Sequence, residues 1–196
     1  MFDKLKTAMR ISRLMGAING DIDNPTKAEQ IVTLIILFPL NKKQKMPFNN
    51  QYVLADAALL AMVYSVSKAE KYYVNRNDMM NDYPKYIRGR NSYTSFHKDV
   101  MQKTFQGIKA MYKVDSLRDN VSDMLMYYDE IISSGDMNNF YNEAVNLFIR
   151  DITYKGYASY KDESLPLYDI KNRMDIEINT RAYFTALFNT IDRYLA

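Results

Sequence analysis

The single histidine of this chain, His97, is the residue best suited to acid–base chemistry. At helical spacing it falls in the middle of an apolar stripe that includes Val100, Thr104 and Ile108. A histidine in this setting is a candidate general base or pH switch. A core histidine that is hydrogen-bonded to the backbone or to a tyrosine explains the same pattern, and we favour that interpretation.

Asp56 is the acid that could pair with His97, because it lies within the apolar run from Val53 to Leu60. A carboxylate surrounded by so many apolar residues must pair, become protonated or reach water. Ser67 and Glu70 fall on the same side of the expected helix, so a structural polar seam is favoured over catalysis. An enzyme built on His97 and Asp56 remains an alternative, although no nucleophile for it can be identified.

An irregular segment from Tyr83 to Lys98 is the strongest candidate binding site, because it alternates cations with tyrosines ahead of an expected helix. Arginines and free backbone amides at such a place could engage phosphates, and tyrosines could stack on unpaired bases. A solvated basic loop with its tyrosines packed on the core is the competing interpretation, slightly favoured by a pI of about 8.8. The residues predicted to bind an anionic partner are Lys85, Tyr86, Arg88, Arg90, Tyr93 and Lys98.

Composition excludes several kinds of chemistry. The chain has no cysteine and one histidine, which rules out disulfides, thiolate metal sites and multi-histidine metal sites. Its six glycines form neither a P-loop nor a dinucleotide fingerprint. Asp21 and Asp23 begin like a calcium loop, but Val32 stands where the bidentate glutamate belongs. We therefore expect no metal and no cofactor.

Charge is divided unevenly along the chain. Residues 1–113 hold 18 Lys and Arg against 9 Asp and Glu, a net charge of +9, whereas residues 114–196 hold 8 against 14, a net charge of −6. Such asymmetry indicates contact with a charged partner, either an acidic protein, a nucleic acid or the acidic half of a second copy in a homo-oligomer. The alternative is that the two halves neutralise each other within one fold.

Apolar periodicity predicts helices throughout, with no strand alternation or hairpin signal. Thr26 and Glu29 have the spacing of a capping box, and Gly20 is expected to end the first helix in a left-handed conformation. The helices are expected at about residues 1–18, 26–38, 50–75, 92–114, 116–132, 137–153 and 169–195. The alanine-rich helix at 50–75 is expected at the centre, because its small side chains allow close approach of neighbours. The prediction is an all-α, single-domain bundle of about six to seven helices covering residues 1–196.

The first helix is expected to be amphipathic. Its apolar stripe is predicted to dock on the core, with the cations Lys6, Arg10 and Arg13 on the opposite side; the stripe comprises Leu5, Ala8, Ile11, Leu14, Met15 and Ile18. The basic side also suits anionic lipid, so peripheral membrane attachment through this helix is a further alternative.

The longest apolar run, Ile31 to Leu40, is shorter than the ~20 residues that a membrane-spanning helix needs, and no secretory signal is visible. We therefore expect a soluble, cytoplasmic protein with no integral membrane segment. The abundance of Lys, Asn, Ile, Tyr and Met is typical of low-GC genomes such as those of phages or mobile elements. The preferred hypothesis is a non-catalytic interaction protein whose basic N-terminal half meets an acidic partner.

Overall fold

A computed structural model of the chain describes residues 2–40, 50–70, 95–114, 142–146, 148–149 and 170–195. Side chains are described for these residues except at positions 2–3, 67–70, 95–97 and 170–173. The described residues are predominantly helical and contain no strand, which confirms the all-α prediction. The elements are α1 (Phe2–Ala17), α2 (Lys27–Leu37), the 3-10 turn η1 (Phe38–Leu40), α3 (Gln51–Glu70), α6 (Ser95–Tyr112) and α9 (Ile170–Leu195).

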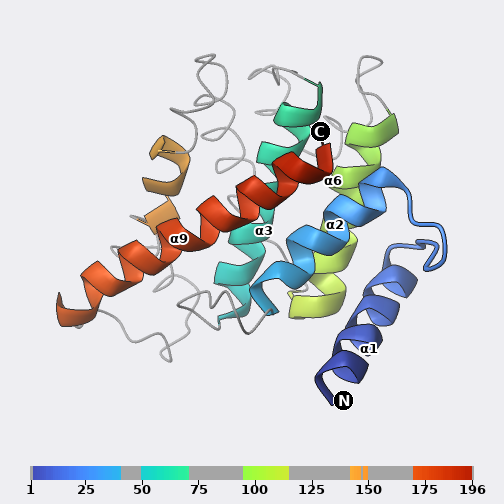
Figure 1. The fold of residues 1–196 in the computed structure, drawn as a ribbon, viewed down its shortest axis with the longest axis horizontal. Coiled ribbons are helices and arrows are strands. Elements are labelled where there is room, and N and C mark those ends of the chain that lie inside the picture. Colours follow the sequence, from blue (N-terminus) through green and yellow to red (C-terminus); the bar gives the residue numbers. More distant parts are fainter. Residues whose placement is uncertain are drawn as a thin grey trace.

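Helix α3 is the centre of the described fold. Every side chain from Val53 to Val66 is buried, including that of Asp56, so this stretch of the helix is covered on all sides. Small residues such as Ala58 and Ala61 allow neighbouring helices to come close. Helices α2, α6 and α9 all contact it, and Figure 1 shows α9 running across it. The prediction of a central alanine-rich helix is confirmed.

Helix α2 begins with the capping box that its sequence predicts. The Thr26 hydroxyl accepts a hydrogen bond from the Glu29 amide at 3.2 Å, and the Glu29 carboxylate accepts one from the Thr26 amide at 2.9 Å. These bonds satisfy two backbone donors at the helix start and fix where α2 begins. The helix then tightens into η1, which contains Pro39.

Helix α6 packs closely on α2 and α1 because Gly107 lies at the contact. A β-carbon there would meet Ile36 Cγ1 and Leu14 Cδ1 at 3.0 Å each. Near the end of α6, the buried Tyr112 hydroxyl donates a hydrogen bond to the Ile36 carbonyl at 2.7 Å. Burial raises the pKa of this tyrosine, so it remains a neutral donor.

Helix α9 is held to α3 by aromatic packing. Tyr64 stacks on Phe188 with ring centroids 4.0 Å apart, and its hydroxyl donates to the Asp192 carboxylate at 2.9 Å. Phe184, which is fully buried, packs edge-on against Phe148. These contacts fix the C-terminal end of α9, which carries Tyr194.

Helix α1 lies at the edge of the molecule and contacts α2 and α6 (Figure 1). Its end differs from the prediction: Asn19, with φ 50°, takes the left-handed conformation that was assigned to Gly20. The Gly20 amide then donates to the Met15 carbonyl at 2.8 Å and closes the last turn. Asparagine tolerates this backbone region better than most residues, which explains the shift by one position.

The predicted apolar stripe of α1 is wrong at its start, where Leu5 and Ala8 are exposed, whereas Ile11 packs half-buried against the core. Leu14, Met15 and Ile18 are buried, as expected, but Leu5 is 55% exposed. Leu5 precedes Leu14 by nine residues, which is about 2.5 helical turns, so the two side chains leave opposite sides of the helix. For the same reason Met9, nine residues before Ile18, is 62% exposed.

Candidate functional site

Most of the predicted anion-binding segment lies outside the described residues. This applies to Lys85, Tyr86, Arg88, Arg90 and Tyr93, so their role stays a prediction. Lys98 is described, and its side chain is half-buried near the start of α6.

The proposed acid–base pair is only partly described. Asp56 is 4% exposed, so this residue is buried, and it does not lack an interaction partner. The side chains of His97, Ser67 and Glu70 lie outside the described set. A pairing of Asp56 with His97 therefore stays a prediction, as does the polar seam.

Lys103 joins three helices through one ammonium group. Its Nζ lies 2.9 Å from Glu29 Oε1 at the start of α2 and 2.8 Å from the carbonyl of Ile18 just after α1. Burial works to raise the pKa of the Glu29 carboxylate. The hydrogen bonds from Lys103 and from the Thr26 amide, together with the positive charge of Lys103, outweigh this effect and hold the pKa below its ordinary value of 4.5. One cation of the basic half is thus neutralised inside the fold.

Three further cations of the basic half donate to carbonyls at helix ends. Arg13 Nη2 lies 3.1 Å from the Ala110 carbonyl at the end of α6, and Lys27 Nζ lies 3.2 Å from the Leu195 carbonyl of α9. Arg10 Nη1 contacts the Leu40 carbonyl at 3.5 Å. The last carbonyls of a helix have no partner within it and carry partial negative charge, so cations are favoured there. Unlike an ion pair, this arrangement leaves the full positive charge of the side chain in place.

The solvent-facing side of α1 combines apolar and cationic side chains. We call Leu5, Lys6, Met9 and Arg13 the outer face of α1; all four are exposed. Within the described residues, no carboxylate forms an ion pair with either cation. The sequence correctly placed Lys6 and Arg13 in solvent but assigned Leu5 to the core.

A groove opens between α1 and α2, which we call the α1–α2 groove. Its volume is about 770 Å³, within the range of small-molecule sites. Helix α2 contributes Gln30, Thr33, Leu34 and Leu37 to its wall, so one face of α2 borders the groove. Helix α1 contributes Ile11 and Met15, together with the polar side chains of Lys6, Thr7 and Arg10.

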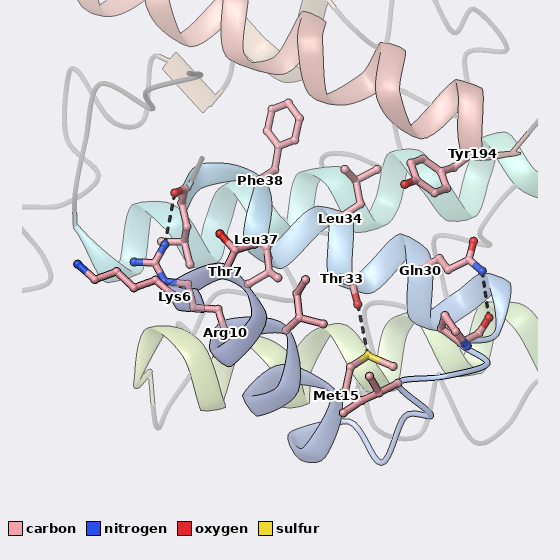
Figure 2. Close-up of a pocket in the computed structure, with 14 residues that line it drawn as sticks. Lys6, Thr7, Arg10, Met15, Gln30, Thr33, Leu34, Leu37, Phe38 and Tyr194 are labelled. Atoms are coloured by element: carbon pink, nitrogen blue, oxygen red, sulfur yellow. Dashed lines mark hydrogen bonds between the residues drawn. The ribbon is translucent and has the colours of Figure 1, made fainter. Parts of the chain in front are cut away.

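The two ends of the α1–α2 groove differ in character. Lys6 and Arg10 lie at one end, near η1, whereas Gln30 and Tyr194 lie at the other (Figure 2). Among the described lining residues there are two cations and no Asp or Glu. No sequence motif marks this groove, because its residues come from α1, α2, the segment between them, η1 and the end of α9.

No family model, curated protein sequence or solved structure matches this chain. In the part that the structure describes, no helix is long and apolar enough to span a membrane. The same residues contain no cluster of three metal-ligating acids or histidines. The outer face of α1 and the α1–α2 groove are the two candidate sites in the described residues.

Proposed function

We propose that this protein is a non-catalytic helical interaction protein whose basic N-terminal half binds an acidic partner protein through the outer face of α1. The observation that carries this proposal is the exposure of Leu5 and Met9, at 55% and 62%, on the same side of α1 as Lys6 and Arg13. Large apolar side chains grouped with unpaired cations are typical of a surface that another molecule covers.

The mixture of side chains favours a protein partner over a nucleic acid. Leucine and methionine offer apolar area but neither hydrogen bonds to base edges nor aromatic rings for stacking. Protein interfaces, in contrast, bury apolar residues at their centre and place charges at the rim. The net charge of +9 on residues 1–113 indicates that the partner surface is acidic.

The outer face is held in place by contacts on the opposite side of α1. Leu14 and Ile18 are buried in the core, and Lys103 binds the Ile18 carbonyl. Arg13, which belongs to the outer face itself, also donates a hydrogen bond to the Ala110 carbonyl at the end of α6. The helix therefore presents its outer face on a fixed support, which lowers the ordering cost of binding.

The experiment measures the affinity of the protein for a synthetic, fluorescently labelled peptide. The peptide is an acidic amphipathic helix built from glutamate and leucine. We expect Leu5→Gln/Met9→Gln to weaken binding by about tenfold, because two apolar side chains lose their buried contacts. We expect Lys6→Glu to weaken it by a similar factor through charge repulsion. Lys109→Glu, an exposed position on α6, is the matched charge-reversal control and should leave affinity unchanged.

Two outcomes would overturn the proposal. Equal binding by wild type and both outer-face variants would remove α1 from the interaction. Binding to phosphatidylserine vesicles, but not to the acidic peptide, would assign the outer face to a membrane surface instead.

A further inference from the structure

We propose that the α1–α2 groove binds an amphiphilic carboxylate, the chemical class that includes free medium-chain fatty acids. This inference goes beyond the interaction described above and does not depend on it, because it concerns a small ligand in the groove. Of the outer face, Lys6 also lines the groove, whereas Leu5, Met9 and Arg13 do not. The structure supplies the two parts that such a ligand requires: an apolar floor and a cationic end.

The cationic end recognises the carboxylate. Lys6 and Arg10 both line the groove, and no described carboxylate forms an ion pair with either. Arg10 uses one donor in a long contact of 3.5 Å with the Leu40 carbonyl, and a guanidinium has five N–H donors. The remaining donors match the fork geometry of a carboxylate, and Lys6 adds a second charge.

The apolar floor fits a hydrocarbon chain. Leu34 and Leu37 on α2 and Ile11 on α1 all line the groove, and the part of α2 that lines it runs from Gln30 to Leu37. Seven residues of helix correspond to about 10 Å, which is the length available to a chain that starts at the cationic end. The Thr33 hydroxyl donates to Met15 Sδ at 3.5 Å. Thr33 therefore offers mainly its apolar atoms to a hydrocarbon chain in the groove.

The far end limits the length of the ligand. Tyr194 of α9 lies there beside Gln30, whose side-chain amide donates to the Pro25 carbonyl at 3.0 Å. Tyr194 is 49% exposed at this end. The site therefore favours one carboxylate followed by a chain of medium length.

The test is a titration of the full-length protein, labelled at its Ile, Leu and Met methyl groups, with sodium decanoate followed by NMR. We expect saturable shifts at Ile11, Leu34 and Leu37. Octanoate should bind about tenfold more weakly, because two methylene groups leave the apolar floor. Decylamine, which has the same chain and the opposite charge, should bind at least about tenfold more weakly than octanoate.

Lys6→Gln/Arg10→Gln removes the cationic end at two exposed positions and should weaken decanoate about tenfold or more. Lys4→Gln/Lys109→Gln removes the same charge outside the groove and should bind like wild type. Equal affinity for decanoate and decylamine, unchanged binding by the Lys6/Arg10 variant, or no saturation at millimolar decanoate would each overturn the inference. Leu5→Gln/Met9→Gln distinguishes the two proposals, since it should weaken the acidic peptide but not decanoate.

Discussion

At the scale of single residues, the Lys103–Glu29 pair is the clearest link between chemistry and fold. Both partners are largely removed from water, with side-chain exposures of 16% and 6%. Two charges in such a place are stable only when both are present and their remaining hydrogen bonds are made. Glu29 meets this condition through Thr26, and Lys103 meets it through the Ile18 carbonyl.

Lys103→Met is therefore expected to destabilise the protein by about 3 kcal/mol, because it leaves the Glu29 carboxylate buried without a counter-charge. Urea unfolding followed by circular dichroism measures the change. Lys109→Met, at an exposed position on the same helix, should cost less than about 0.5 kcal/mol. An equal effect of both substitutions would show that the pair contributes nothing specific.

The same pair predicts how stability depends on pH. Because the pKa of Glu29 is lower in the folded state than its ordinary 4.5, the unfolded chain binds more protons in this range. The contribution of Glu29 is complete above pH 4.5 and is lost as the pH falls below that value. Unfolding experiments on Glu29→Gln should show a shallower loss of stability in acid than wild type, and an identical slope would contradict this assignment.

Contacts between residues close in the sequence could be predicted, whereas contacts between distant residues could not. The Thr26–Glu29 capping box was predictable because both partners lie within one helical turn. The Lys103–Glu29 pair was not, because 74 positions separate its members and only the packing of α6 on α2 brings them together. The apolar neighbours of Asp56 indicated that its carboxylate needs a partner, and the residue is buried in the structure.

At the scale of elements, the two faces of α1 carry the functional argument. One face docks on α2 and α6 through Leu14 and Ile18, and the other exposes Leu5 and Met9. Helix existence and approximate bounds were predictable from periodicity, since α2, α6 and α9 all begin and end within a few residues of expectation. The two faces of α1 were missed because residues three or four positions apart share one side of a helix. Over nine positions, as from Leu5 to Leu14, the helix turns by about half a revolution beyond two full turns, so the side chains point in opposite directions.

Close packing of α6 gives a prediction at this scale. Gly107→Val is expected to destabilise the fold by at least about 1 kcal/mol, because its side chain would collide with Ile36 and Leu14. Gly16, a helical position on α1 with open space around it, supplies the contrast: Gly16→Ala should stabilise by about 0.5 kcal/mol. Thermal unfolding of both variants measures the difference, and a stable Gly107→Val protein would contradict the tight contact.

At the scale of the whole molecule, five cations of the basic half that the structure describes have three different surroundings. Lys103 is neutralised by a carboxylate, whereas Arg10, Arg13 and Lys27 donate to backbone carbonyls and keep their charge exposed. Lys6 is exposed and has no ion-pair partner in the described part of the chain. The charge asymmetry predicted a basic surface, but only the fold could show which cations remain available to a ligand.

The measurement that tests the central claim most directly is the salt dependence of wild-type binding to the acidic amphipathic peptide. If exposed cations of α1 attract an acidic partner, the Kd should rise about tenfold as salt increases from ~50 mM to ~500 mM, with the slope reduced in Lys6→Glu. An affinity that does not change with salt, or that changes equally in wild type and Lys6→Glu, would contradict the account.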